Sequence, residues 1–175
     1  KLRGGVYSII PDQIEAGTYM TAVAAAGGEV RINNIIPKHL DCITAKLVEM
    51  GVDVEEDGDS LIIRREGKLT STNVKTMPYP GFPTDMQPQI AAVLCLAKGT
   101  SILNEGVWDN RYRYADEFRR MGANIQVNGK VAVIEGVEVP HRGPAVCLRP
   151  AGRGGYDCSR LGSPRGDRGG PGLPH

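Results

Sequence analysis

The 175-residue sequence lacks the features that define several broad classes of protein. No stretch approaches the roughly 18 consecutive apolar residues that a membrane-spanning helix needs, and no signal-peptide pattern opens the chain. Its four cysteines show no CxxC or other metal-ligand spacing, and its three histidines are scattered. We therefore expect no membrane association, no metal site and no disulfide framework.

The few cysteines and histidines are expected to have structural roles. Cys42 and Cys95 lie in apolar helical patterns and are predicted to be reduced core residues. His39 stands at the start of a predicted helix, where a structural role is favoured over a catalytic one. The chain also begins at Lys1 without an initiator methionine, which is typical of a segment cut from a longer protein.

The net charge of +1 hides an uneven distribution of charge along the chain. Residues 1–140 contain 15 lysines and arginines against 18 aspartates and glutamates, whereas residues 141–175 contain six arginines against two aspartates. The larger part is therefore slightly acidic, and we expect no nucleic-acid partner.

The last 35 residues have a composition of their own. Glycine, proline and arginine make up 20 of the residues 141–175, which contain no lysine, no glutamate and no periodic apolar pattern. Such enrichment in proline and glycine predicts a disordered segment. A genuine basic tail that binds an acidic partner is the alternative interpretation.

Residues 1–140 are predicted to form two repeats, at about 1–69 and 70–140, related by an offset of about 71 residues. The positions that match are Gly28 and Gly99, Met50-Gly51 and Met121-Gly122, and Gly58 and Gly129. Each repeat reads as strand, helix, strand, helix and a closing hairpin, which is the order βαβαββ.

The expected elements follow from apolar periodicity and from turn residues. In the first repeat they are strand 6–10, helix 12–26, strand 29–32, helix 38–50 and a hairpin of strands 52–55 and 60–64. In the second they are strand 73–75, helix 84–97, strand 101–104, helix 111–121 and a hairpin across 128–129. Strand-helix-strand crossovers favour parallel pairing and hairpins add antiparallel pairing. We therefore predict an α/β fold with mixed sheets, whose apolar helical faces pack inward against one another.

A proline-rich run at residues 76–87 is the most distinctive stretch of the chain. Its prolines oppose helix formation, because proline fixes φ and restricts the residue before it. The chain is predicted to become helical at Thr84, a good N-cap residue, which places Asp85 in the first helical turn. The helix dipole favours an anion there, so the run is expected to end in an ionised, accessible carboxylate. The alternative is that Asp85 only stabilises the helix start.

The run also resembles a known family signature. It contains Pro78-Tyr79-Pro80-Gly81-Phe82-Pro83-Thr84-Asp85-Met86-Gln87. This string closely resembles a motif of the UDP-N-acetylglucosamine 1-carboxyvinyltransferases, the enolpyruvyl transferases that begin peptidoglycan synthesis. Residues 9–18 form a second similar stretch, residues 120–123 a weaker third, and the resemblance extends to about residue 139. It implies the family's inside-out α/β barrel of βαβαββ repeats.

The resemblance implies a transferase that adds the 3′-hydroxyl of UDP-N-acetylglucosamine to phosphoenolpyruvate in the cytoplasm, without a metal or another cofactor. Asp85 matches the family's proposed base, and Val107 matches a position that contacts the nucleotide sugar through the backbone. The alternative for Val107 is a packing role at the end of strand 101–104, which its sequence position fits equally well. Thr84 is a further candidate for the uridine side. Asp109 and Arg111, at a helix start, are expected to be solvated or ion-paired.

Most of the phosphoenolpyruvate site is expected to lie outside the matching stretch, because the family's phosphate-binding lysine and arginines and its loop cysteine have no match here. The chain is therefore expected to be inactive alone. The alternative is a non-catalytic fragment that binds a nucleotide sugar or has only a structural role. The tail from His141 has no match either, and one hypothesis is that it arose by a frameshift. The nucleotide sequence decides this, because an uninterrupted family reading frame through His141 would support it.

Overall fold

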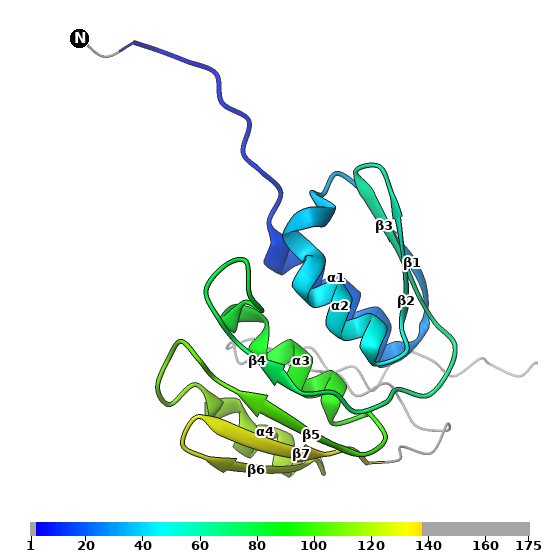
Figure 1. Ribbon diagram of the computed structural model, residues 1–175, viewed down its shortest axis with the longest axis vertical. Coiled ribbons are helices and arrows are strands. Elements are labelled where there is room, and N and C mark those ends of the chain that lie inside the picture. Colours follow the sequence, from blue (N-terminus) through cyan, green and yellow to red (C-terminus); the bar gives the residue numbers. More distant parts are fainter. Residues whose placement is uncertain (1–2, 138–175) are drawn as a thin grey trace, which may run out of the picture. The chain divides into compact units, whose positions relative to one another are not determined.

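The computed structural model describes residues 3–137 (Figure 1). In the first half of the chain the elements are α1 (Gln13–Ala26), β1 (Gly28–Ile32), the 3-10 helix η1 (Pro37–Leu40), α2 (Asp41–Glu49), β2 (Asp53–Asp57) and β3 (Ser60–Arg65). In the second half they are β4 (Val74–Lys75), the 3-10 helix η2 (Thr84–Met86), α3 (Gln87–Leu94), β5 (Thr100–Asn104), the 3-10 helix η3 (Tyr112–Tyr114), α4 (Ala115–Arg120), β6 (Asn124–Asn128) and β7 (Val131–Glu135). The predicted tail at 141–175 lies outside the described residues.

The strands form two sheets, with the orders β1-β3-β2 and β4-β5-β7-β6. The first sheet is antiparallel, whereas in the second β4 pairs in parallel with β5 and the other pairs are antiparallel. The predicted α/β fold with a mixed sheet is thus confirmed. The shared order of β1-β3-β2 and β5-β7-β6 supports our proposal of two repeats at about 1–69 and 70–140.

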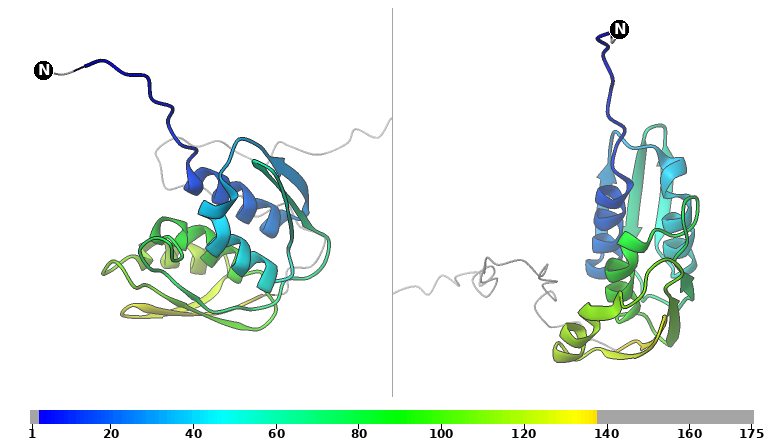
Figure 2. Two further views of the ribbon diagram at one scale, coloured as in Figure 1. Left: turned by 45° about the horizontal axis from the view of Figure 1, so that its top comes forward. Right: turned by 90° about the vertical axis from the view of Figure 1, so that its left-hand side faces the viewer.

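The helices of the two halves pack against one another. Helices α1 and α2 lie on one face of the first sheet, and α1 packs against α3 (Figures 1 and 2). The apolar face at Leu40, Ile43, Leu47 and Met50 is almost completely buried. At the contact between the halves, a Cβ added to Gly17 would lie only 3.1 Å from the Met86 side chain, which is fully buried. The prediction of inward-packed helices is therefore confirmed.

Local signals at the element ends explain where several elements start and stop. The Asp12 carboxylate accepts a hydrogen bond from the Ile14 backbone N–H at 2.8 Å and so caps α1. The two hairpins turn at Gly58 and Gly129, whose φ angles of 63° and 58° favour glycine. Both predicted hairpin turns are therefore confirmed.

The strand predicted at residues 6–10 is not formed. Residues 3–12 contain no helix or strand, and the side chains of Val6 and Ile9 are 103% and 89% exposed. Apolar residues favour an extended backbone, but a strand also needs a neighbour that satisfies its N–H and C=O groups. Within residues 3–137 β1 pairs with β3 alone, so the edge of β1 that corresponds to the β4 edge of β5 is not paired with residues 6–10.

Three of the predicted helices are divided and shorter than expected. Those predicted at 38–50, 84–97 and 111–121 each begin with a short 3-10 helix (η1, η2 and η3) and continue as α2, α3 and α4. Such 3-10 turns are frequent at the ends of α-helices. Among residues 3–137, no helix is long and apolar enough to cross a membrane.

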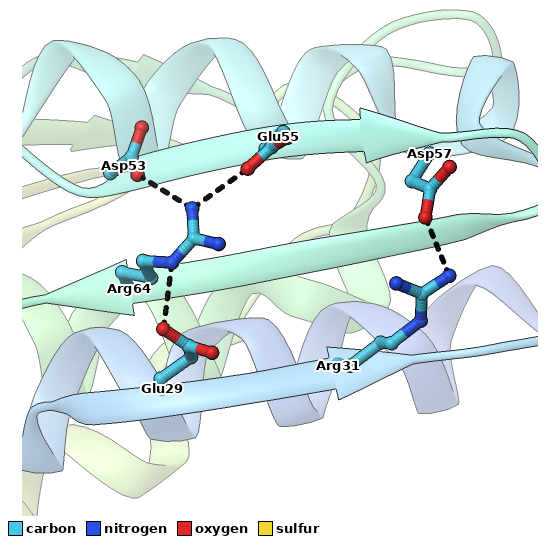
Figure 3. Close-up of polar contacts among 6 residues, drawn as sticks. All are labelled: Glu29, Arg31, Asp53, Glu55, Asp57 and Arg64. Carbon is cyan, nitrogen blue, oxygen red and sulfur yellow. Dashed lines mark hydrogen bonds and ion pairs between the residues drawn. The ribbon is translucent and has the colours of Figure 1, made fainter.

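The outer face of the first sheet carries a network of charged side chains (Figure 3). Arg64 on β3 donates to Glu29 at 2.7 Å, to Glu55 at 2.9 Å and to Asp53 at 3.2 Å. Glu29 and Asp53 lie directly opposite Arg64 on the two neighbouring strands. Exposed ion pairs of this kind contribute little to stability. We interpret this surface as a solvated sheet face rather than a binding site.

The two described cysteines are free thiols, as predicted. Cys95 is buried, and burial raises the pKa of its thiol to about 11. Cys42 is half-buried, with its thiol 3.3 Å from the carbonyl oxygen of Gly81. Neither thiol shows the lowered pKa of a nucleophilic cysteine.

Replacing Gly136 with alanine is expected to destabilise the protein by about 1–3 kcal/mol or more, the usual range for overpacking. Gly136 follows β7, and a Cβ there would stand 1.6 Å from the carbonyl oxygen of Ala97. Thermal unfolding followed by circular dichroism measures the change. Gly67→Ala is the matched control, because nothing lies within 4 Å of its added Cβ. We expect that control to change stability by no more than about 0.5 kcal/mol. Equal stability of the two variants would contradict the packing at Gly136.

Candidate functional site

The proline-rich run folds back on itself before it reaches α3. The Met77 backbone N–H donates to the Phe82 carbonyl oxygen at 2.9 Å, and the Phe82 side chain is buried. The Gly81 N–H donates to the Pro78 carbonyl oxygen at 2.9 Å, which closes a turn inside the run. These hydrogen bonds therefore fix the conformation of the run where it enters η2.

Thr84 does not cap the helix that follows. The N-cap residue is Pro83, and no side chain makes a capping hydrogen bond there. The Thr84 hydroxyl instead donates to the carboxylate of Glu105, at 3.0 Å from each oxygen. The N-cap prediction for Thr84 is therefore wrong. The reason is that a hydrogen bond to a buried carboxylate is charge-assisted and stronger than a neutral one.

Asp85 lies in the first turn of the helical segment, as predicted. Its side chain is 64% exposed, and its Oδ1 atom accepts a hydrogen bond from Nη2 of Arg111 at 2.6 Å. Arg111 is thus ion-paired, which was one of its two expected roles. Because a carboxylate has two acceptor oxygens, Oδ2 remains for a second donor. Asp85 can therefore accept a hydrogen bond or a proton from a molecule that approaches from solvent.

Glu105, directly after β5, accepts hydrogen bonds from both sides of the site. Its Oε1 atom accepts from the backbone N–H groups of Val107 and Trp108, at 2.9 Å and 3.1 Å. Its Oε2 atom accepts from the side-chain amide of Gln87 at 2.6 Å. The side chain of Glu105 is almost completely buried, with the residue only 1% exposed.

These hydrogen bonds determine the charge state of Glu105. Burial on its own would raise the pKa of this carboxyl, but donation from Trp108, Thr76, Val107 and Thr84 lowers it below its ordinary value. The carboxylate is therefore an anion at neutral pH. It also affects Tyr112 on the neighbouring η3, whose pKa rises to about 12 through burial first and the charge of Glu105 second.

Gly106 holds the turn after Glu105 tightly against the preceding strand segment. Its N–H donates to the Thr76 hydroxyl at 2.9 Å. A Cβ at position 106 would stand 2.2 Å from the Thr76 carbonyl oxygen, so only glycine fits. The turn at residues 105–108 is thereby fixed to the end of β4.

The three residues predicted for the site lie in one neighbourhood. Thr84 and Val107 both donate to Oε1 of Glu105, and Asp85 follows Thr84 directly in the chain. The Arg111 ion pair ties Asp85 to the same loop from the other end. The Val107 N–H already donates to Glu105. The carbonyl oxygen of Val107 is therefore the backbone group that remains for a contact with a ligand.

Glu105 was not among the residues predicted for the site, although one signal in the sequence could have identified it. Alternate residues of β5 share one face, and Ser101 and Leu103 on that face are fully buried. Glu105 continues the same alternation at the end of the strand. An acidic residue in a buried register needs hydrogen-bond donors nearby, so this alternation marks Glu105 as a candidate for a buried, hydrogen-bonded carboxylate.

An open cleft of about 470 Å³ lies next to the proline-rich run. Its lining residues are Ile10, Pro11, Asp12, Gln13, His39 and Tyr79. The rings of His39 and Tyr79 meet edge to face, with centroids 6.1 Å apart, which gives His39 a packing role. Within residues 3–137, no three His, Cys, Asp or Glu side chains are grouped so that they could hold a metal ion.

A comparison with protein families decides which family this chain represents. The family model described as EPSP synthase (3-phosphoshikimate 1-carboxyvinyltransferase) matches residues 1–149. The chain belongs to the EPSP synthase family. All the candidate residues described above lie within the range matched to that family.

Relatives of this EPSP synthase family member carry a more specific name. The chain is 59% identical over 137 residues to a UDP-N-acetylglucosamine 1-carboxyvinyltransferase of Clostridium botulinum, which is 78% of this chain and 33% of that protein. A protein of the same name from Desulfofundulus thermocisternus is 51% identical over 143 residues, covering 82% of this chain and 58% of that protein. The resemblance found in the sequence is thus confirmed. The chain spans only about a third of the length of the first relative.

Solved structures agree with this family assignment. The enolpyruvyl transferase NikO from Streptomyces tendae superposes with a TM-score of 0.65 and 28% identity, over 73% of this chain and 31% of that protein. EPSP synthase from Acinetobacter baumannii gives a TM-score of 0.56 at 19% identity, over 75% and 32% of the two chains, and so supports the fold alone. The predicted enolpyruvyl transferase fold is confirmed.

Proposed function

We propose that this chain is part of a UDP-N-acetylglucosamine 1-carboxyvinyltransferase and supplies its general base, Asp85. The observation that carries this proposal is the placement of an exposed carboxylate, fixed by Arg111 at 2.6 Å, beside the turn that contains Val107. The names of relatives that are 59% and 51% identical support the choice of acceptor.

In the proposed reaction, the 3′-hydroxyl oxygen of the N-acetylglucosamine unit forms a bond to C2 of phosphoenolpyruvate. Its proton passes to Asp85, and an acid from another part of the protein protonates C3. Loss of a proton from C3 then expels phosphate from C2 and leaves an enol ether. General-base catalysis of the first step needs the hydroxyl within about 3 Å of a carboxylate oxygen. Oδ2 of Asp85 is the oxygen open to it, because Oδ1 already accepts from Arg111.

Val107 and Thr84 form part of the nucleotide-sugar surface in this proposal. Val107 contributes its carbonyl oxygen, since Glu105 takes its N–H. Thr84 is half-buried and lines the uridine side, with its hydroxyl held by Glu105. The parent reaction supplies peptidoglycan synthesis, and through it cell-wall formation, cell shape and division. Because it consumes a nucleotide sugar and phosphoenolpyruvate, a cytoplasmic location is part of the proposal.

A chimera tests this function directly. Residues 3–137 replace the matching third of the Clostridium botulinum relative, and phosphate release is measured with phosphoenolpyruvate and each of two acceptors. We expect release with UDP-N-acetylglucosamine and none with 3-phosphoshikimate, the acceptor in the family's own description. A folded chimera that uses 3-phosphoshikimate, or neither acceptor, would contradict the proposal. Circular dichroism establishes that the chimera is folded.

A further inference from the structure

The carboxylate of Glu105 connects two segments that are distant in the sequence. From one side, Thr84 and Gln87 donate to it through their side chains, at 3.0 Å and 2.6 Å. From the other side, Val107 and Trp108 donate through their backbone N–H groups, at 2.9 Å and 3.1 Å. The first segment carries Asp85 and the second carries the Val107 carbonyl.

A buried carboxylate imposes strict requirements on its donors. Removing this anion from water is costly unless hydrogen bonds replace the lost hydration. Within the described residues its donors are neutral hydroxyl, amide and backbone groups rather than a cation. Any movement of one segment away from the other therefore leaves a buried charge with fewer partners. The two segments are held at a fixed spacing for this reason.

The turn that contains Val107 is also fixed on its other side. Gly106 donates to the Thr76 hydroxyl, and its Cα lies too close to the Thr76 carbonyl oxygen for any Cβ to fit. With one side of the turn fixed to Thr76, the Glu105 carboxylate joins the turn directly to Thr84, and the Arg111–Asp85 ion pair joins the same loop to Asp85.

We propose that Glu105 is a positioning residue, which holds the Thr84–Asp85 segment and the Val107 turn at the spacing that one nucleotide-sugar substrate requires. The inference rests on the proposed function, since the two segments matter together only if they contact the same ligand. Glu105 itself, almost completely buried, touches no substrate.

Two variants distinguish the role of Glu105 as a hydrogen-bond acceptor from the role of its side-chain size in packing. Glu105→Met keeps the length of the side chain and removes both acceptor oxygens. Glu105→Gln keeps one oxygen for Val107 and Trp108, provided that Gln87 turns its amide to accept from the new amide group. Oε1 of Gln87 is buried without a hydrogen-bond partner in the described structure, so it can take that role.

Amide hydrogen exchange of the 175-residue chain, read by NMR, tests the positioning. A hydrogen bond to a charged group is worth enough that its loss should accelerate exchange at Val107 and Trp108 by roughly 10- to 100-fold in Glu105→Met. Glu105→Gln should recover most of that protection. Ile63→Ala, a fully buried position on β3, is the control for general destabilisation. It should leave Val107 and Trp108 no more affected than the rest of the chain.

Phosphate release by the chimera described above tests the link to the reaction. Glu105→Met should lower kcat, Glu105→Gln should restore part of it, and Ile63→Ala should leave it near the parent value below the melting transition. Unchanged exchange at Val107 and Trp108 in Glu105→Met, or an unchanged kcat in a folded Glu105→Met chimera, overturns the inference. If the unmutated chimera fails to turn over, the proposed function fails, and the exchange data still decide whether Glu105 positions the turn.

Discussion

Replacing Asp85 with asparagine is expected to lower the turnover of the chimera by roughly 10²–10⁴, the usual contribution of a general base. Asparagine keeps the size of the side chain and an oxygen that can accept from Arg111, so the hydrogen bond is retained although the charge is lost. It cannot take up the proton of the sugar hydroxyl. Because Asp85 is 64% exposed, the loss of its charge should change stability by only about 1 kcal/mol or less. Phosphate release and the thermal midpoint measure the two effects.

Asp109 offers a matched control for Asp85. Its side chain is 81% exposed and its Oδ1 lies 2.9 Å from Nζ of Lys130, so it is also an exposed aspartate in an ion pair. Asp109→Asn should leave the rate near the parent value. If Asp85 only stabilises the helix start, the Asp85→Asn variant will instead lose thermal stability and keep its turnover. That result would remove Asp85 from the mechanism.

The 175-residue chain alone is expected to release no phosphate from phosphoenolpyruvate in the presence of UDP-N-acetylglucosamine. The developing charge on the phosphate and carboxylate groups needs positioned cations and donors, which often supply the largest catalytic contribution. Among residues 3–137, Arg111 is the cation that contacts Asp85. Its side chain is already paired with that carboxylate and so is not available to bind phosphate. The exposed position of Asp85 also leaves the reacting groups in water.

A phosphate assay on the purified chain, with the chimera as positive control, tests this expectation. Release that depends on both substrates would show that the chain contains a complete active site and would contradict the proposal. Calorimetric titration with UDP-N-acetylglucosamine is the companion measurement. Binding without turnover would favour the alternative of a non-catalytic nucleotide-sugar-binding segment.

Local patterns were sufficient to predict most elements of the fold. The apolar spacing from Leu40 to Met50 and the glycine turns at Gly58 and Gly129 depend on neighbours in the sequence, and the structure agrees with each of them. The strand predicted at residues 6–10 is not formed, and here the local pattern was insufficient. Whether an extended segment becomes a strand depends on a pairing partner that its own residues do not specify.

The candidate site shows the same limit more clearly. Placing Asp85 in a first helical turn needed only the residues around it. The partner of the Thr84 hydroxyl is 21 residues away, and capping propensity gives no information about such a contact. Glu105 was overlooked because acidic residues are usually exposed, and its burial depends on hydrogen-bond donors that only the folded chain brings together.

The close approach of Gly17 to Met86 has a consequence for sequence divergence. A Cβ at position 17 would stand 2.8 Å from Cδ1 of Ile43 and 3.1 Å from the Met86 sulfur, so residues 17 and 86 compete for the same space. Residue 86 directly follows Asp85, and the atoms that an added Cβ would meet are the ends of the Ile43 and Met86 side chains, so a larger residue 17 requires these two side chains to repack next to the carboxylate. Homologous chains that carry a larger residue at position 17 are expected to carry a smaller one at position 43 or 86 as compensation. Packing next to the proposed base would in this way link a glycine to a carboxylate 68 residues later in the chain.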